Sequence, residues 1–339
     1  MQRILIVAPN WIGDSLLAQP LLARLQQRYP AASIDALAPA WTSAVLQRMP
    51  QLRQVISTPF VHGPLQLRQR WQLARQLRQN DYRLAVVLPN SLKAALLPWF
   101  AGIPQRAGFV GESRYGLINR LHRLDKQALP LMAERYAQLA EDPGNAPQRP
   151  LGAVQLRVDL ANRASQLQRL GLQLDKPVSV FCPGAEYGPA KRWPSAHFAS
   201  LAQQLAGEGR QVWLLGGAGD QAIGEAIVQA SQGAAINLCG QTDLASAIDL
   251  MSLADQVVSN DSGLMHVAAA LGRPQVALYG SSSAAHTPPL NPAAQLLMPE
   301  GLACSPCFAR VCPLGHFRCM TELTPARVMR ALQQLATPQ

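Results

Sequence analysis

"VVSNDSGLMHVAAALGRPQVALYG", residues 257–280, predicts a strand, a helix and a second strand. The first apolar run ends near Ser259, a helix rich in small residues follows from Ser262, and Gly272 precedes the next apolar run. Two apolar runs joined by a helix are typical of parallel strands in an α/β fold. The corner between the first strand and the helix also carries an acid, a hydroxyl, a glycine and a histidine. Folding does not require all four, so we treat this corner as a candidate site.

The same alternation of apolar runs and helical patterns occupies most of the chain. Strands are expected at residues 3–9, 33–39 and 83–90, and again at 178–184, 211–217, 234–240, 256–261 and 275–280. Helices are expected at residues 15–29, 42–49, 91–100, 160–170, 195–207, 221–229 and 244–254, and from 262. Such alternation predicts parallel sheets covered by helices on both faces. Two series of this kind predict two doubly wound, Rossmann-like domains.

The boundary between the two domains is expected within residues 140–152, where proline and glycine accumulate and the periodicity is lost. The predicted domains are therefore residues 1–150 and 151–339. A closing helix is expected at 324–335, with Pro325 in its first turn.

Composition places the chain among globular proteins. It has 339 residues, of which 48% are hydrophobic and 15% charged. No apolar run approaches the roughly 18 residues of a membrane span. The N-terminal apolar stretch is too short for a signal peptide and is expected to be a strand, so a cytoplasmic location is predicted.

The formal net charge is +10, and most of the basic residues are arginines. Genome composition is one explanation, and binding of phosphate-bearing partners, which the guanidinium group suits, is another. The arginines cluster loosely at residues 68–70, 75–83 and 114–123. No basic stripe interleaved with aromatic residues is present, so nucleic acid is excluded as a partner. An anionic substrate or a membrane surface fits this charge better.

Ligands of open parallel sheets bind beyond the carboxyl ends of the strands. After the first strand come Asn10, Trp11, Gly13 and Asp14. Gly13 is expected to form a tight turn, and Asp14 either caps the next helix or acts in function. This corner has neither a dinucleotide-binding glycine pattern nor a P-loop.

Two further corners lie in the second half of the chain. The long, Pro/Gly-rich loop after residue 181 presents Lys191 and Arg192, which either bind a phosphate or are solvated surface charges. After the following strand, Gly216 permits a close approach of backbone to a ligand. Asp220 either binds ribose hydroxyls or caps the next helix.

The fourth corner is the stretch quoted first. Asp261 or Ser262 is expected to cap the helix, and Gly263 leaves its first amides open to an anion. Ser262 and His266 are four residues apart and share one helix face. A histidine in an alanine-rich helix is usually packed in a core, but one turn from an open helix start it favours a ligand contact. The corner is therefore interpreted as a pyrophosphate-binding site.

These residues resemble a known family. The run from Asn260 to His266, followed by alanines 268–270, resembles the donor-site motif of the ADP-heptose:lipopolysaccharide heptosyltransferases of glycosyltransferase family 9. Residues 9–14, 182–186 and 188–194 resemble the heptosyltransferase II group in particular, and "VLPNSLKAAL" and "AGIPQRAGF" are similar as well. The resemblance covers nearly the whole chain. It implies a GT-B fold, with two Rossmann-like domains facing across a cleft and the closing helix packed back on the first domain.

The resemblance also implies residue roles in an inverting reaction that needs no metal cofactor. Asp14 would be the general base, and Lys191 would bind the donor's phosphates. The other donor-binding residues would be Gly184, Gly216, Asp220, Asp261, Ser262, Gly263 and His266. The acceptor-side residues would be Asn10, Trp11, Gly13, Ser91 and Lys93. The implied partners are ADP-heptose and the heptosyl-Kdo2-lipid A inner core, reached at the cytoplasmic face of the inner membrane.

The segment "CSPCFARVCPLGHFRCM" departs from the pattern expected for that group. It contains Cys304, Cys307, Cys312 and Cys319, with His316 as a further candidate ligand. The leading C-x-x-C favours a structural zinc site, whereas the other spacings match no zinc motif, and free thiols are the alternative in a reducing compartment.

Four functions are compatible with these features. The principal hypothesis is transfer of a heptose to the first heptose of the lipopolysaccharide core. Addition of heptose I or III is a related alternative, because acceptor choice depends on N-terminal loops. A GT-B-like sugar-nucleotide epimerase and a non-catalytic sugar-nucleotide or lipid A binding protein are alternatives from other classes.

Overall fold

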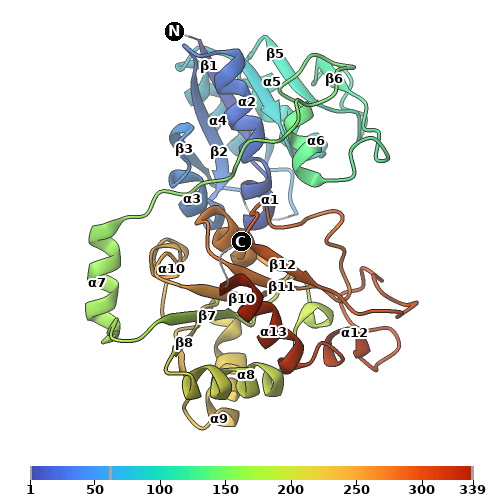
Figure 1. The fold of residues 1–339 in the computed structure, drawn as a ribbon. Helices are drawn as coiled ribbons and strands as arrows, with labels where there is room; N and C mark the ends of the chain where they lie inside the picture. The colour runs from blue at the N-terminus through green and yellow to red at the C-terminus, as the bar shows by residue number, and fades with distance from the viewer. Residues whose placement is uncertain (1, 61–62, 337–339) are drawn as a thin grey trace. The chain divides into compact units, whose positions relative to one another are not determined.

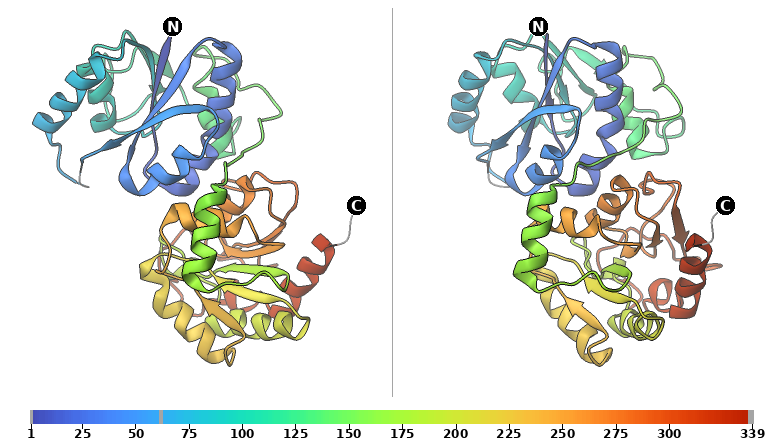
Figure 2. Two further views of the ribbon diagram at one scale, coloured as in Figure 1. Left: turned by 90° about the vertical axis from the view of Figure 1, so that its left-hand side faces the viewer. Right: turned by 60° about the vertical axis from the view of Figure 1, so that its left-hand side comes forward.

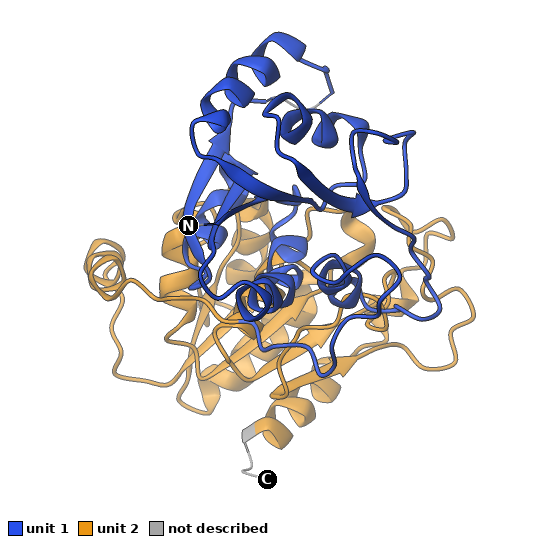
Figure 3. Ribbon diagram, turned by 90° about the horizontal axis from the view of Figure 1, so that it is seen from above, with its two compact units in different colours: residues 1–154 blue, residues 155–339 orange. Residues whose placement is uncertain are grey.

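The computed structural model describes residues 2–60 and 63–336. The chain divides into two compact units, residues 1–154 and 155–339 (Figure 3). The division follows the Pro/Gly-rich segment in which the boundary was expected. Each unit contains one parallel six-stranded sheet among the described residues.

In the first unit the strand order is β3-β2-β1-β4-β5-β6, and all of its pairings are parallel (Figure 1). The strands are β1 (Arg3–Val7), β2 (Ser33–Pro39), β3 (Leu52–Thr58), β4 (Tyr82–Val87), β5 (Gln105–Phe109) and β6 (Arg120–His122). The helices are α1 (Ile12–Leu17), α2 (Gln19–Arg28), α3 (Ala40–Gln47), α4 (Leu67–Arg78), α5 (Leu92–Phe100) and α6 (Met132–Gln138). This is the strand order of a doubly wound Rossmann-like domain.

The second unit repeats this topology, because its strand order is β12-β11-β10-β7-β8-β9 (Figure 2). The strands are β7 (Val178–Cys182), β8 (Gln211–Leu214), β9 (Ala235–Asn237), β10 (Gln256–Asn260), β11 (Gln275–Leu278) and β12 (Ala294–Leu297). The helices are α7 (Leu160–Leu170), α8 (Ser195–Gly207), α9 (Gln221–Ala230), α10 (Leu244–Met251), α11 (Gly263–Ala270), α12 (Arg318–Thr321) and α13 (Pro325–Ala336). Two short 3-10 turns, Pro189–Lys191 and Ala218–Asp220, lie in its loops.

The central strands are apolar along their whole length because helices cover both faces of each sheet. β1 buries Ile4, Leu5 and Ile6, and β10 is buried throughout. Helix α13 packs on α8, β11 and β12 within the second unit and adds Val328 and Leu332 to its core. The packing of this closing helix on the N-terminal domain stays a prediction.

The first helical segment differs from the expectation. In place of one helix over 15–29 there are two, because α1 ends at Leu17 and α2 begins at Gln19. Pro20 is therefore in the first turn of α2, where the missing N–H of proline costs no hydrogen bond. Gly13 lies inside α1 and forms no turn before it. Asp14 is in the first turn of α1, whose N-cap is Trp11, so Asp14 is not the cap.

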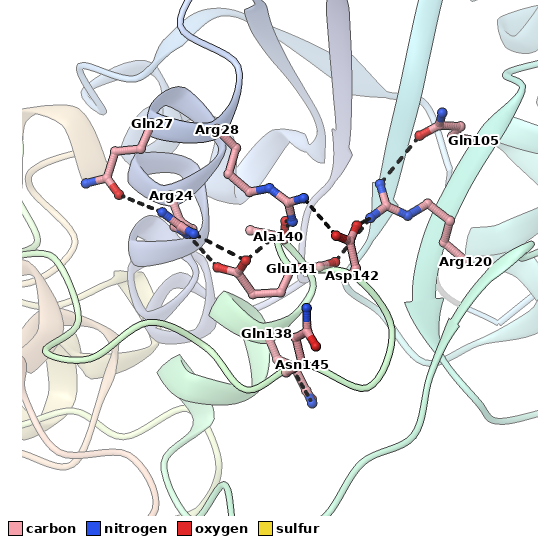
Figure 4. A network of polar contacts seen from close by, with 10 residues as sticks. All are labelled: Arg24, Gln27, Arg28, Gln105, Arg120, Gln138, Ala140, Glu141, Asp142 and Asn145. Carbon is pink, nitrogen blue, oxygen red and sulfur yellow. Dashed lines mark hydrogen bonds and ion pairs between the residues drawn. The ribbon is translucent and has the colours of Figure 1, made fainter.

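Arginines of the first unit anchor the segment after α6. Figure 4 shows Glu141 and Asp142 between α2 and β6. Glu141 accepts hydrogen bonds from Arg24 at 2.5 Å and Arg28 at 3.3 Å, and Asp142 pairs with Arg120 at 2.7 Å. The charges of these three arginines are therefore neutralised by carboxylates of the same unit.

The arginine cluster at 114–123 is thus largely structural. Arg114 is only 1% exposed, and its guanidinium group donates to the Pro89 carbonyl at 2.9 Å and to the Asn90 side chain. It holds the loop that follows β4. Of the two explanations for the basic composition, ligand binding does not apply to Arg114 and Arg120.

His122 of β6 makes stability depend on pH. Its ring is fully buried, and neither ring nitrogen has a hydrogen-bond partner among the described residues. Burial, and secondly the charge of Arg120, lower the pKa of His122 to about 4. The folded state therefore binds a proton less readily than the unfolded chain, whose histidine pKa is about 6.5.

We expect this histidine to stabilise the fold above about pH 6.5 and to lose up to about 3 kcal/mol of that contribution as the pH falls to about 4. In His122→Phe, which keeps an aromatic ring but cannot be protonated, Tm should fall less over this range. Thermal unfolding of both proteins between pH 7 and 4 measures the difference. Parallel Tm curves would contradict the assignment.

Candidate active site

The candidate site of the second unit lies where its strand order reverses. β7 and β10 are neighbours, and the chain leaves them in opposite directions along the sheet. A crevice at the carboxyl ends of such strands is the usual ligand site of this fold. The loop after Cys182 and the corner at residues 261–263 both start at this point.

The loop and the corner are joined by an ion pair. Lys191 Nζ lies 2.6 Å from Asp261 Oδ2, and the two side chains are 17% and 6% exposed. The Lys191 ammonium also lies 5.1 Å from the centre of the Tyr187 ring. Lys191 is therefore held in place at the sheet edge and is not a freely solvated surface charge. Arg192 donates weakly to the Ala185 carbonyl at 3.4 Å.

No side chain caps the first turn of α11. Its N-cap residue is Ser262, whose side chain makes no capping hydrogen bond, and Asp261 pairs with Lys191 instead of capping. The expectation that one of the two caps this helix is wrong. Ser262, Gly263 and Leu264 are partly exposed. Uncapped amides at a helix start, together with the helix dipole, form an anion-binding site.

His266 lies one turn into α11 and is 5% exposed. Burial lowers the pKa of His266 to about 4, the Asp261 charge acts in the opposite direction, and Lys191 lowers it further. The imidazole is therefore neutral at pH 7, so it offers one donor and one acceptor and adds no positive charge.

Three predicted donor-binding residues come together at the next corner. A Cβ atom on Gly184 or on Gly216 would collide with the Asp220 carboxylate or its Cβ, so this packing requires glycine at both positions. Asp220 accepts the Gly217 N–H at 3.0 Å and does not cap α9. Burial raises the pKa of Asp220, and the Gly217 N–H opposes this shift.

Asn260 begins the run that resembles the donor-site motif, but sequence patterns assigned it no role of its own. It is fully buried at the end of β10. Its Oδ1 accepts the Trp193 N–H at 3.0 Å, and its Nδ2 donates to the Pro183 carbonyl at 2.7 Å. One side chain thus fixes both ends of the loop that carries Lys191. Its place between Ser259 and Asp261 was a signal, but its partners are distant in sequence.

We expect Asn260→Ala to lower the free energy of unfolding by about 2–4 kcal/mol, because two buried backbone groups lose their partner. For the donor that the sequence resemblance implies, the released loop should also raise KM more than it lowers kcat. Denaturant unfolding and steady-state kinetics measure both effects. Asn237→Ala is a comparison variant, since Asn237 is the last residue of β9 and also bonds to backbone. Equal effects of the two variants on KM would contradict the positioning role.

The cysteine-rich segment supports the same loop. The Arg310 carbonyl accepts the Ala190 N–H at 3.0 Å, and the Phe308 carbonyl accepts the Tyr187 hydroxyl at 2.8 Å. Sequence patterns gave no sign of these contacts. They make the segment part of the support of the Lys191 loop.

The four thiols do not form a recognisable metal site. Cys304 Sγ lies 4.0 Å from His316 Nε2, but within residues 2–60 and 63–336 no group of three or more His, Cys, Asp or Glu side chains could hold a metal ion. The six cysteines are all free thiols. The structural zinc site at Cys304, Cys307, Cys312 and Cys319 stays a prediction.

The acceptor-side residues follow β1 and β4 of the first unit, the neighbouring strands at which its strand order reverses. Trp11 is 49% exposed, and the Asn10 carbonyl accepts the Trp41 Nε1–H at 2.8 Å. Ser91 and Lys93 have structural partners. The Ser91 hydroxyl caps α5, and Lys93 Nζ donates to the Gly63 carbonyl at 2.8 Å.

Asp14, the predicted general base, is partly exposed in α1 of the first unit. Its charge contributes, after burial, to a raised pKa of Tyr136 in α6. Asp14 therefore lies close enough to the Tyr136 phenol for its charge to act on it. Only a carboxylate in the ionised form can accept a proton as a base.

No helix in the described part of the chain combines the length and the apolar character that crossing a bilayer requires.

Comparison with known proteins identifies the family. The model of glycosyltransferase family 9 (heptosyltransferase) matches residues 70–318. The chain is 44% identical to the lipopolysaccharide heptosyltransferase 2 of Escherichia coli K12, over 98% of each chain. It is 41% identical to the lipooligosaccharide heptosyltransferase 2 of Haemophilus ducreyi, over 98% of this chain and 99% of the relative.

Solved structures support the same family and fold. The E. coli ADP-heptose lipopolysaccharide heptosyltransferase II superposes with a TM-score of 0.88 at 43% identity, over 99% of this chain and 98% of the other. An E. coli heptosyltransferase solved with ADP gives a TM-score of 0.72 at 20% identity, over 99% of this chain and 100% of the other, and shares the fold. The predicted fold class, two doubly wound domains of GT-B type, is confirmed. The chain is a glycosyltransferase and belongs to glycosyltransferase family 9, the heptosyltransferases.

Proposed function

We propose that this protein transfers L-glycero-D-manno-heptose from ADP-heptose to the first heptose of the lipopolysaccharide inner core. The observation that carries the donor side is the Lys191–Asp261 pair beside the uncapped start of α11, at the switch point of the second sheet. The acceptor side draws on the heptosyltransferase 2 relatives, which match along almost the whole chain.

Departure of ADP is the step that the second unit would assist. As the bond from the heptose anomeric carbon to the phosphate oxygen breaks, negative charge grows on the diphosphate. Lys191 and the α11 amides would stabilise this charge without a divalent ion. The diphosphate would displace part of the Asp261 contact with Lys191. The neutral His266 imidazole can donate one hydrogen bond to the same group.

Proton removal from the acceptor hydroxyl is the step that we assign to Asp14. Inversion needs a base on the face of the sugar opposite the leaving group. The proposal requires the two units to close on the substrates, because an exposed donor would be hydrolysed by water. No metal takes part in these steps.

Turnover on three core acceptors, which carry no heptose, one heptose or two heptoses, tests the proposal. ADP-heptose should be consumed with an acceptor that carries the first heptose and not with one that lacks it. Consumption with the acceptor that lacks heptose would indicate addition of heptose I, and use only of an acceptor already carrying two heptoses would indicate heptose III. Release of free or epimerised sugar without acceptor would indicate an epimerase. Donor that binds but is never consumed would indicate a binding protein.

We also propose a structural role for zinc at the cysteine-rich segment. What supports it is the leading C-x-x-C alone, because no three His, Cys, Asp or Glu side chains of the described residues are grouped so that they could hold a metal ion. Metal analysis of freshly purified protein tests it, and a metal-free protein with full activity would contradict it. We further propose that the protein works in the cytoplasm at the inner membrane, where the lipid-linked acceptor is located.

A further inference from the structure

Helix α4 of the first unit presents an unusual exposed side. Leu67 is 50% exposed and Trp71 is 47% exposed. They are four residues apart, so they lie next to each other on the helix surface. The side of the helix that packs into the unit is made by Arg70, Leu73, Ala74 and Leu77. Large apolar groups are thus displayed to solvent although the helix has a complete buried side of its own.

The same exposed side is strongly basic. Arg68 and Arg75 are exposed, and the Arg75 guanidinium lies 4.9 Å from the centre of the Trp71 ring. Arg68 makes no ion pair with any described residue. Neither α4 nor α5 contains an acidic residue, and the Glu112 carboxylate meets only the start of α5, where it accepts the Leu92 N–H at 2.7 Å.

Helix α5 adds a second tryptophan. Arg70 donates to the Lys93 carbonyl at 3.1 Å near the starts of the two helices, and Arg78 donates to the Phe100 carbonyl at 2.6 Å near their ends. The helices therefore run side by side in one direction. Trp99, which precedes Phe100, is 47% exposed. We call Leu67, Arg68, Trp71 and Arg75 the α4–α5 face, beside which α5 exposes Trp99.

We propose that the α4–α5 face docks on a bilayer that contains anionic phospholipid. Tryptophan and leucine bury their rings and methyl groups at the level of the headgroups, and arginines beside them neutralise phosphate. Helices α4 and α5 carry basic but no acidic residues, which makes this surface complementary to anionic lipid, and each basic residue near such a lipid surface adds attraction that salt screens. The inference extends the proposed function, whose acceptor is lipid-linked, but it rests on residues outside the assigned sites.

Co-sedimentation of the full chain with vesicles tests the inference without any acceptor. The protein should bind vesicles of phosphatidylcholine with phosphatidylglycerol, and binding should weaken with salt. Arg68→Gln/Arg75→Gln should reduce the partition about tenfold or more, and Trp71→Ser should reduce it as well. The matched control is Arg83→Gln/Arg123→Gln, which removes the same charge from two other exposed arginines of this unit. Thermal unfolding confirms that each variant folds.

Two results would overturn the inference. One is equal vesicle binding by the two double variants, and the other is wild-type binding to pure phosphatidylcholine vesicles that equals its binding to vesicles with phosphatidylglycerol. Turnover with a deacylated, soluble acceptor separates it from the proposed function, because the α4–α5 face variants should keep that turnover. If the wild-type protein binds anionic vesicles but transfers no heptose, the proposed function fails and the docking face stands. If it transfers heptose but does not bind anionic vesicles, the docking face fails and the proposed function stands.

Discussion

Replacing Asp14 by asparagine should lower kcat about a hundredfold or more while the affinity for ADP-heptose stays nearly unchanged. General base catalysis contributes about 10²–10⁴ in rate, and asparagine keeps the shape of the side chain but accepts no proton. Asp14 lies in the first turn of α1 on the first unit, whereas the donor groups lie in the second. Steady-state turnover and calorimetric donor titration measure the two quantities.

The stability of Asp14→Asn has to be checked alongside, because Asp14 interacts with neighbours in the folded state. Asp14→Glu is the companion variant, since it retains a base at a displaced position and should recover part of the rate. Normal turnover by Asp14→Asn would refute the base assignment. A loss of donor affinity equal to the loss of rate would assign the residue to binding instead.

Replacing Lys191 by methionine should lower kcat/KM for the donor about 10²–10³-fold, the size of effect seen when one group that stabilises transition-state charge is removed. The same change should destabilise the fold by about 3 kcal/mol, because Asp261 is only 6% exposed and loses its cation. Kinetics with ADP-heptose and denaturant unfolding measure the two effects in one protein.

The double variant Lys191→Met/Asp261→Asn separates these effects. Removing the buried charge along with its partner should recover most of the stability, and the rate should stay low because the diphosphate still lacks the ammonium. Recovery of activity together with stability would show that Lys191 serves only the fold. Lys191→Arg should be impaired as well, since a guanidinium group does not replace a compact ammonium held between Tyr187 and Asp261.

The sequence predicts the central strands well because their burial on both faces leaves uninterrupted apolar runs, as in β1, β7 and β10. The edge strand β3 gave no such run, since exposed Arg53 and Gln54 interrupt it. Helix α4 was not predicted, because its four arginines interrupt the apolar pattern of the segment. Two of those arginines, Arg68 and Arg75, belong to the α4–α5 face, whereas Arg70 is buried and Arg78 donates to the Phe100 carbonyl. The arginines that hid the helix in the sequence thus include the two on which the docking inference depends.

The candidate site could be located from the sequence but not assembled from it. The carboxyl-end rule selected the corners at Asp14, Lys191 and Asp261, because position along parallel strands is a local property. Contacts between corners depend on strand order, which local patterns do not encode. The ion pair of Lys191 with Asp261 joins residues 70 positions apart, and Asn260 reaches Trp193 across 67. Asp261 makes no cap because it pairs with a lysine 70 positions away, whereas Asp220 makes none because it accepts the nearby Gly217 N–H.

A crystal structure with intact ADP-heptose is the most direct test of how the donor is held. We expect the diphosphate to accept hydrogen bonds from the first amides of α11 and from Lys191 Nζ, with the adenosine toward Asp220 and the anomeric carbon open to Asp14. A diphosphate bound away from the start of α11, with Lys191 still paired only to Asp261, would contradict the account.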